Sequence, residues 1–414
     1  MTSRYSALAL LREGLAGQRG WAPAWRDSKP KAGYDAIVIG GGGHGLATAY
    51  YLARNHGLTN IALIERGWLG GGNTGRNTTI IRSNYFFPES AAFYDFSLRL
   101  YETMSRDLNY NIMFSQRGMW MLAHDRHGVE MLRRSANAMR LNGVDAELHD
   151  GNEVMRRIPG LEPRRFPILA GLCQPRAGSA RHDAVAWAYA RGASALGVDI
   201  IQNCEVKDFI IEGGRVRGIE TSRGLMMADR IGMAVAGHTS TLAAKAGFRL
   251  PVSSYALQAF VSEPVKPCLD TVVLSPATGT YLSQSDKGEL VIGAGLDLYL
   301  SYAQRGNLPW MERAAAGVIE LFPAFSRMRF LRQWAGIVDV VHDSTPIIGK
   351  TPVDGLYVNC GWGTGGFKAI PAGGWCLAHA MATGAPHELA RAFQLERFST
   401  GALIDEASAS GIAH

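Results

Sequence analysis

The chain has 414 residues, of which 47% are hydrophobic and 19% are charged, so it has ample material for a core and is not a disordered protein. At about 150 residues per domain, this length predicts two or three structural units. The net charge of +6 comes from 42 basic and 36 acidic residues that are intermixed along the chain, which argues against nucleic-acid binding. The five cysteines show neither CxxC nor Cys/His spacing, which argues against a disulfide scaffold and a structural metal site.

Residues 1–33 are interpreted as an arm or linker. Their apolar stretch at 7–11 is too short for a secretory signal and is followed at once by Arg12 and Glu13, so we predict a short amphipathic helix that could pack on a partner subunit. The sequence has no run of about 18 uncharged apolar residues, and we expect no membrane-spanning helix. Free cysteines without an export signal predict a cytoplasmic protein.

A dinucleotide-binding motif follows the arm. Residues 34–39 predict a buried parallel strand, residues 46–53 a helix, and residues 61–64 a second strand that ends at Glu65. The turn between the first strand and the helix has the form G-x-G-x-x-G and contains Gly40, Gly42, Gly43, His44 and Gly45. Its glycines allow a tight turn and a close approach to a pyrophosphate, while Glu65 accepts hydrogen bonds from ribose hydroxyls. The motif therefore predicts an adenine dinucleotide rather than a structural glycine turn.

A second loop, residues 67–79, is rich in Gly, Asn and Thr and lies directly behind Glu65. Its amide, hydroxyl and backbone groups suit a long cofactor that lies across the sheet, which favours FAD over NAD; the alternative is a flexible surface loop. The residues of this region that we expect to contact the cofactor are Asn73, Arg76, Thr78 and Ile80.

Later strands indicate that the cofactor domain is assembled from separate segments. Residues 204–219 predict a β-hairpin with a Gly-Gly turn, in which Val206 contacts the cofactor, and residues 230–238 predict a strand that enters a glycine turn. We expect an α/β fold in which a Rossmann-like FAD-binding domain is interleaved with a mixed-sheet (α+β) substrate domain. The expected ranges are 34–125, 180–250 and 335–390 for the FAD-binding domain, 126–179 and 251–334 for the substrate or interface domain, and 391–414 for a C-terminal tail.

The chain resembles the glycine oxidase/sarcosine oxidase branch of the FAD-dependent amine oxidoreductases, and within it the β subunits of bacterial heterotetrameric sarcosine oxidases. The segments that carry this likeness are 40–52, 71–85, 174–178, 181–183 and 359–368. The resemblance implies FAD in this chain, FMN between it and an α subunit, and γ and δ subunits in the same enzyme. It implies oxidation of sarcosine to glycine, with electrons passing from FAD to FMN and then to O2 to give H2O2. A one-carbon unit would go to tetrahydrofolate on the α subunit.

Two basic residues are candidates for holding the carboxylate of this substrate. By the resemblance, Arg82, at the end of a predicted strand edge, and Lys368, in a glycine-rich turn, clamp the carboxylate. Gly363, Gly366 and Lys368 would also contact the flavin. Two nearby cations would lower the pKa of the substrate amine, so no dedicated base is required. The alternatives are a surface ion pair for Arg82 and a solvated cation for Lys368. Asp339, His342 and Asp343 are weaker candidates for roles in orienting the substrate. A purely structural role in a turn before a strand explains these residues at least equally well.

His182 directly precedes a predicted helix in which Asp183 is the N-cap, so its imidazole is expected to be exposed and neutral. A neutral imidazole can attack the 8-methyl carbon of a flavin after tautomerisation. The resemblance places covalent FMN on His182, with Arg181 as a flavin or phosphate contact; the alternative is a capping or core histidine. Single-chain sarcosine oxidases attach FAD to a cysteine just before the last cofactor segment. Residues 334–348 contain no cysteine, so we expect non-covalent FAD.

Three functions are compatible with these residues. The first is the sarcosine-oxidising subunit described above. The second is a related single-chain FAD-dependent oxidase or dehydrogenase that acts on glycine, dimethylglycine or an opine. The third is a non-catalytic, flavin-holding subunit. Flavin that stays on the denatured chain would favour the first function over the second, and loss of turnover in Arg82→Ala would exclude the third.

Overall fold

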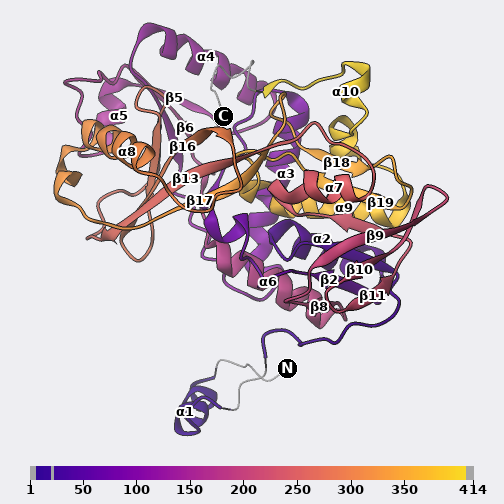
Figure 1. Ribbon diagram of the computed structural model, residues 1–414. Helices are drawn as coiled ribbons and strands as arrows, with labels where there is room; N and C mark the ends of the chain where they lie inside the picture. The colour runs from indigo at the N-terminus through magenta and orange to yellow at the C-terminus, as the bar shows by residue number, and fades with distance from the viewer. Residues whose placement is uncertain (1–5, 20–22, 407–414) are drawn as a thin grey trace.

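The computed structural model describes residues 6–19 and 23–406, and the described chain has two sheet-based parts that lie side by side (Figure 1). The first part is built on a six-stranded sheet. In order across the sheet, its strands are β18 (Ile347–Lys350), β19 (Leu356–Cys360), β12 (Ile231–Met233), β1 (Ala36–Ile39), β2 (Ile61–Ile64) and β8 (Asp199–Ile201). All neighbours are parallel except β18 and β19. Because β12 pairs with β1, the prediction that late strands return to the first sheet is confirmed.

The two faces of this sheet have different covers, since side chains alternate along each strand. Ala36 and Val38 pack toward three helices, whereas Ile37 and Ile39 pack toward a small antiparallel sheet. The helices are α2 (Gly43–His56), α6 (His182–Ala195) and α9 (Ile370–Thr383). The strands of the small sheet are β9 (Val206–Glu212), β10 (Arg215–Thr221) and β11 (Gly224–Met227). The predicted hairpin is confirmed as β9 and β10, which are joined by the Gly213–Gly214 turn.

The second part is an eight-stranded mixed sheet. In order, its strands are β17 (Phe330–Val340), β13 (Ser253–Pro264), β16 (Glu289–Leu300), β15 (Thr280–Gln284), β14 (Val272–Ser275), β4 (Met119–Ala123), β6 (Ala170–Gln174) and β5 (Glu147–Asp150). Only β14 and β4 are parallel neighbours. Two cores fill its faces, one with helices α5 (Gly151–Arg157) and α8 (Leu308–Leu321) and the other with α4 (Arg126–Leu141).

The two parts are more closely interleaved than the expected residue ranges imply. β4 lies at the end of the range 34–125 and β17 overlaps the range 335–390, yet both strands pair within the eight-stranded sheet. Asp339 lies on β17 of this sheet and lines a cavity that also borders β1 and β2 of the six-stranded sheet. The residue ranges of the domains therefore stay a prediction, whereas the fold class, a Rossmann-like unit interleaved with a mixed-sheet unit, is confirmed.

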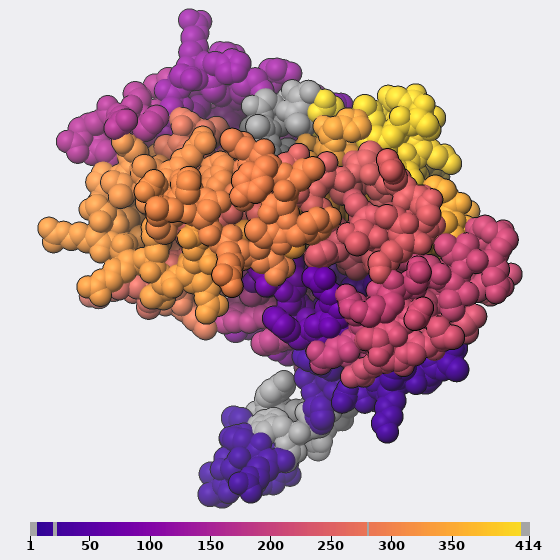
Figure 2. All heavy atoms as spheres, in the orientation of Figure 1, coloured from indigo at the N-terminus to yellow at the C-terminus, as the bar shows by residue number. Residues whose placement is uncertain are grey.

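The remaining elements include the predicted helix of the arm, α1 (Ala7–Leu15), which stands away from the rest of the chain in Figure 2. The others are α3 (Pro88–Asp107), α7 (Thr239–Lys245), α10 (Arg397–Thr400), and the short strands β3 (Ile80–Ile81) and β7 (Gly178–Ser179), which pair with each other. Within residues 6–19 and 23–406, no helix combines the length and the apolar character that crossing a membrane requires.

Candidate active site

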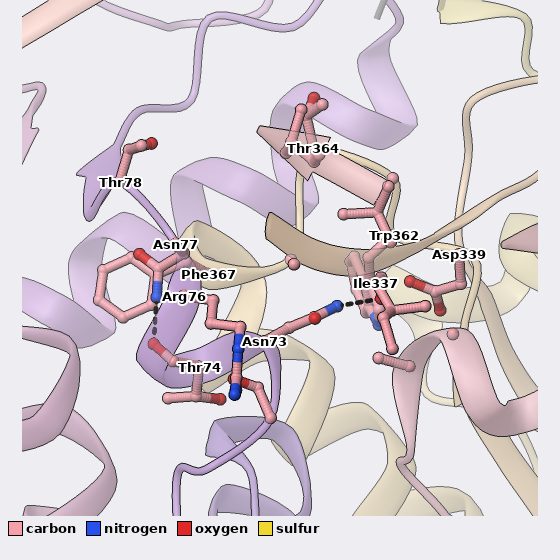
Figure 3. Close-up of a pocket in the computed structure, with 18 of the residues that line it drawn as sticks. Asn73, Thr74, Arg76, Asn77, Thr78, Ile337, Asp339, Trp362, Thr364 and Phe367 are labelled. Atoms are coloured by element: carbon pink, nitrogen blue, oxygen red, sulfur yellow. Dashed lines mark hydrogen bonds between the residues drawn. The ribbon is translucent and has the colours of Figure 1, made fainter. Parts of the chain in front are cut away.

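A cavity of about 1090 Å³ runs from the glycine turn after β1 to the edge of the eight-stranded sheet. This volume is in the range of cofactor and substrate pockets. All the predicted cofactor contacts except three lie on its wall, and Figure 3 shows part of this lining. Those on the wall are Gly40, Gly42, Gly43, His44, Glu65, Asn73, Arg76, Thr78, Ile80, Val206, Gly363, Gly366 and Lys368. The turn residue Gly45 packs behind the wall, and Arg181 and His182 lie outside the cavity.

The glycine turn has no room for larger residues at two positions. A Cβ atom on Gly40 would lie 2.3 Å from the carbonyl oxygen of Ala234, and one on Gly45 would lie 1.9 Å from the carbonyl oxygen of Gly40. The first residues of α2 line the cavity, so the positive end of the helix lies at its wall, where the Gly43 amide donates to the Thr74 hydroxyl at 2.9 Å. This cradle fits the pyrophosphate of a dinucleotide.

Glu65 and the second loop complete this end of the cavity. The Glu65 carboxylate accepts the amide hydrogens of Gly41 and Gly67, both at 2.8 Å, which fixes it at the cavity wall. In the loop, the side chain of Asn73 donates to the carbonyl oxygen of Ile337 on β17, and the hydroxyl of Thr78 donates to that of Tyr281 at 3.0 Å. The loop is therefore ordered by the neighbouring sheet, as Figure 3 shows for Asn73, and is not a flexible surface loop.

The opposite wall is the loop after β19, which His44 holds in place. Its Nε2 lies 2.8 Å from the carbonyl oxygen of Gly366, and its ring stacks on Trp362 with centroids 4.6 Å apart. A carbonyl only accepts, so Nε2 carries the proton, and burial lowers the pKa of His44 to about 4. The indole of Trp362 in turn donates to Asn359 at 2.6 Å. His44 thus connects the dinucleotide turn to the loop that carries Lys368.

Asp339 holds the same loop from β17. Its buried carboxylate accepts the amide hydrogen of Gly361 at 2.6 Å, and its backbone carbonyl accepts that of Gly363 at 2.8 Å. Burial raises the pKa of this carboxyl to about 7. Of the three weaker candidates, only Asp339 lines the cavity. Asp343 forms a buried ion pair with Arg397 at 2.8 Å, and the His342 ring packs beside Phe398.

The raised pKa of Asp339 gives a stability prediction. The carboxyl titrates near 3.9 in an unfolded chain, so between about pH 4 and 7 the folded state binds the proton more tightly and stability falls as the pH rises. Asp339→Asn keeps an acceptor for Gly361 and cannot ionise. We expect this variant to be more stable than the parent at pH 8, by roughly 3–4 kcal/mol, and equal to it below about pH 4. Urea unfolding at the two pH values measures the difference; a gain that is independent of pH would contradict the assignment.

Arg82 and Lys368 meet at the far end of the cavity. The Arg82 guanidinium donates to the Asn84 side chain at 2.6 Å and lies 5.0 Å from the ring centroid of Tyr85. The Lys368 ammonium donates to the carbonyl oxygen of Thr364 at 3.1 Å, and Lys368 is only 5% exposed. Burial, and then the charge of Arg82, lower the pKa of Lys368 well below its usual value. Lys368 is therefore not a solvated loop cation.

Comparison with known proteins indicates which cofactor the cavity binds. Residues 35–380 match the family model described as FAD dependent oxidoreductase. The chain belongs to the FAD-dependent oxidoreductases. Sarcosine oxidase subunit beta of Rhodobacter capsulatus is 53% identical over 413 residues, which cover 99% of this chain and 100% of that relative. This confirms the resemblance noted from the sequence, and the chain is an enzyme of the oxidoreductase class that uses FAD.

Solved structures agree with this oxidoreductase fold. L-proline dehydrogenase from P. horikoshii matches with a TM-score of 0.84 at 26% identity, over 90% of this chain and 100% of that one. Glycine oxidase from Geobacillus kaustophilus matches with a TM-score of 0.81 at 21% identity, over 89% of this chain and 99% of that one. The interleaved α/β architecture is therefore that of amine and amino-acid oxidoreductases.

Several residues of the oxidoreductase site were not identified from the sequence. Tyr85 and Tyr94 stack with centroids 3.8 Å apart, and both rings lie 6.0 Å from the Lys368 ammonium. Glu406, in the segment expected to be a tail, lines the cavity and accepts the amide hydrogens of Phe86 and Phe87 at 3.1 and 3.0 Å. Aromatic residues near Arg82 were a weak signal for the first pair, and no local pattern marks Glu406.

The surroundings of His182 differ from the sequence-based expectation. Helix α6 begins at His182 with Arg181 as its N-cap, so Asp183 lies in the first turn and is not the cap; its carboxylate instead pairs with Arg181. The imidazole is largely buried rather than exposed, and burial lowers its pKa. Its Nδ1 is buried without a hydrogen-bond partner among the residues that the structure describes. The expectation of a neutral imidazole agrees with this environment.

Proposed function

We propose that this FAD-dependent oxidoreductase oxidises sarcosine to glycine. The observation that carries the proposal is the pairing of Arg82 with the buried Lys368 at one end of the flavin cavity. Two basic groups beside stacked aromatic rings suit a small amino acid whose carboxylate needs charge-assisted hydrogen bonds. The identity of the amino acid follows from the name of the Rhodobacter capsulatus relative.

In this proposal Arg82 binds the substrate carboxylate and Lys368 accepts a proton from the substrate ammonium. Burial and the charge of Arg82 lower the pKa of Lys368 well below its usual value, so in this proposal the site favours a neutral amine on Lys368 before the substrate binds. A bound carboxylate favours the charged ammonium of Lys368, so the substrate ammonium can pass its proton to Lys368. This transfer leaves the substrate amine neutral, which is its reactive form. It also leaves Arg82 and the charged Lys368 to bind the carboxylate. The two-electron chemistry is supplied by FAD when it is bound.

This assignment revises the role that the sequence suggested for Lys368. A lowered pKa weakens the repulsion that Lys368 exerts on the substrate ammonium, so in this proposal Arg82 is the main source of that repulsion. The rings of Tyr85 and Tyr94 stack beside the Lys368 ammonium, and such low-polarity neighbours strengthen electrostatic interactions there.

We further propose that His182 carries covalent FMN and that FAD is held without a covalent bond. The support is a neutral, largely buried imidazole whose Nδ1 has no partner in the described chain. The site lies close behind the FAD cavity: Thr79 lines the cavity, and its carbonyl accepts the amide hydrogen of Ala180, two residues before His182, at 3.2 Å. Arg181, whose guanidinium pairs with Asp183, is the proposed contact of the FMN phosphate.

The wider scheme follows from the same resemblance and is proposed with it. Electrons would pass from FAD to FMN and on to O2, giving H2O2, while the one-carbon unit is transferred to tetrahydrofolate on a partner subunit. The partners would be α, γ and δ subunits, in the cytoplasm. The word "subunit" in the name of the relative supports an assembly of several chains.

Turnover of the assembled enzyme tests the substrate. The chain, co-expressed with its neighbouring subunits and purified, should release H2O2 with sarcosine at least about tenfold faster than with glycine or dimethylglycine, since one methyl group changes transition-state binding by roughly that factor. A preference for glycine, dimethylglycine or an opine, from the chain alone, would instead establish the single-chain alternative.

Mass spectrometry of the peptide that contains His182 tests the FMN proposal. We expect this peptide to carry FMN and the acid-precipitated chain to be yellow. His182→Ala should precipitate colourless, whereas replacing the exposed His127 should change nothing. An unmodified His182 peptide from enzyme that turns over sarcosine would refute the covalent bond and leave the sarcosine assignment intact.

A further inference from the structure

We propose that helix α3 and the end of strand β6 form a brace that fixes Arg82 relative to Lys368, and that Gln174 and Ser97 are its positioning residues. The inference rests on the proposed function, because it concerns how the two carboxylate-binding groups are held. Neither Gln174 nor Ser97 lines the cavity, so any effect that they have on the substrate is indirect.

On the Lys368 side, α3 holds two consecutive backbone carbonyls. The hydroxyl of Ser97 donates to the carbonyl oxygen of Lys368 at 2.6 Å, and the hydroxyl of Tyr101 donates to that of Phe367 at 2.6 Å. Ser97 and Tyr101 are fully buried. Buried hydrogen bonds of this kind are costly to break, because each partner is left unsatisfied away from water. They therefore fix the backbone from which the Lys368 side chain extends.

On the Arg82 side, Gln174 forms two hydrogen bonds with Ser83, the residue that follows Arg82. The side-chain oxygen of Gln174 accepts the amide hydrogen of Ser83 at 2.9 Å, and its side-chain nitrogen donates to the Ser83 hydroxyl at 2.7 Å. Ser83 and Gln174 are 0% and 1% exposed. The strand that precedes Arg82, β3, is only two residues long, so it gives Arg82 little support of its own. Gln174 supplies that support.

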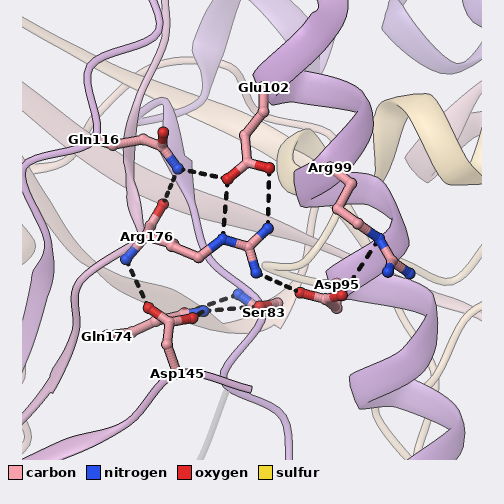
Figure 4. Close-up of polar contacts among 8 residues, drawn as sticks. All are labelled: Ser83, Asp95, Arg99, Glu102, Gln116, Asp145, Gln174 and Arg176. Atoms are coloured by element: carbon pink, nitrogen blue, oxygen red, sulfur yellow. Dashed lines mark hydrogen bonds and ion pairs between the residues drawn. The ribbon is translucent and has the colours of Figure 1, made fainter. Parts of the chain in front are cut away.

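Arg176 connects the two sides, as Figure 4 shows. Its guanidinium donates two hydrogen bonds to Glu102 at 3.0 Å each and one to Asp95 at 3.1 Å, and both acids lie on α3. Asp145 accepts from the Arg176 amide at 2.7 Å and from the Gln174 side chain at 3.1 Å. The end of β6, which positions Arg82, is thus attached to the same helix that positions Lys368.

This arrangement has a functional consequence. A carboxylate that binds to both cations requires a fixed spacing between them, and a misplacement of about 1 Å can cost up to roughly 10²-fold in rate or binding. The contacts of Arg176 are partly exposed, and each contributes little stability by itself. Their role in the brace is geometric, since the planar guanidinium fixes direction as well as distance.

The test uses methoxyacetate, which replaces the amine of sarcosine by an ether oxygen and keeps the carboxylate. Its dissociation constant for the purified holoenzyme is read from the change in flavin absorbance, and KM and kcat are measured with sarcosine. For Gln174→Met we expect both the dissociation constant and KM to rise by about tenfold. For Ser97→Ala we expect both to rise by about threefold. We expect kcat to change by less than about threefold, because carboxylate binding is shared by ground and transition states. The matched control is Arg99→Ala, which removes an outer ion pair of Asp95 and should leave all three constants unchanged.

The possible outcomes separate the brace from the proposed function. Unchanged methoxyacetate binding in Gln174→Met and Ser97→Ala, or an equal shift in Arg99→Ala, overturns the brace while sarcosine oxidation stands. A fall in kcat without a change in KM also overturns it. If Gln174→Met does not fold, Ser97→Ala, which removes a single oxygen atom, decides the question. If the parent enzyme shows neither methoxyacetate binding nor sarcosine turnover, the proposed function fails and the brace fails with it.

Discussion

Replacing Arg82 with alanine should lower kcat/KM for sarcosine by about 10²–10³-fold, which corresponds to roughly 3–4 kcal/mol of lost transition-state binding. The reason is that the planar guanidinium of Arg82 can form charge-assisted hydrogen bonds with a carboxylate, whereas burial disfavours the charged form of the neighbouring Lys368. Without Arg82, the substrate carboxylate would meet Tyr85, Lys368 and the carboxyl of Glu406, which line the same cavity. Steady-state kinetics of the assembled enzyme measure the loss.

Two further variants make this result specific. Arg82→Lys should recover part of the activity, since it restores a charge without the planar pair of donors. Replacing Arg126, which is exposed on α4, should have no effect. If Arg82→Ala kept full turnover with FAD bound, the chemistry would lie elsewhere and the chain would be a flavin-holding subunit.

The features that the sequence predicted well are local ones. The strand, glycine turn, helix and second strand that end at Glu65 follow from patterns within 32 residues, 34–65, and the structure reproduces them. The Gly213–Gly214 hairpin was equally predictable, because turn type depends on the residues in the turn itself. In both cases backbone conformation and side-chain alternation are decided by near neighbours along the chain.

The features that the sequence did not predict depend on contacts between distant segments. His44 was expected to contact the cofactor, but its ring also supports a loop more than 300 positions away, at Gly366. Glu406 reaches the cavity only because the last described residues fold back over the start of α3, where it accepts the amides of Phe86 and Phe87. The burial of Lys368, and with it the lowered pKa, likewise depends on aromatic rings from α3 and from the segment before it.

Replacing Lys368 with methionine should stabilise the protein while it impairs the enzyme. An unfolded lysine titrates near 10.4, and burial lowers the pKa of Lys368 in the folded state. Between those two values the unfolded chain binds the extra proton, so the parent loses stability as the pH falls from 10 toward 7. Lys368→Met removes this loss. Its gain in unfolding free energy should therefore be larger at pH 7 than at pH 10, whereas replacing the exposed Lys350 should give no such difference.

The same variant should reveal the proton transfer in its pH–rate profile. If Lys368 accepts the proton of the substrate ammonium, Lys368→Met can use only the small fraction of sarcosine that is already neutral in solution. Its kcat/KM should then rise about tenfold per pH unit between pH 7 and 9, while the parent shows a shallower rise. At pH 7 the variant should be slower by roughly 10²–10³-fold, since it lacks both the proton acceptor and the second carboxylate contact. Parallel profiles for parent and variant would show that Lys368 does not take the proton, and the clamp would then rest on Arg82 alone.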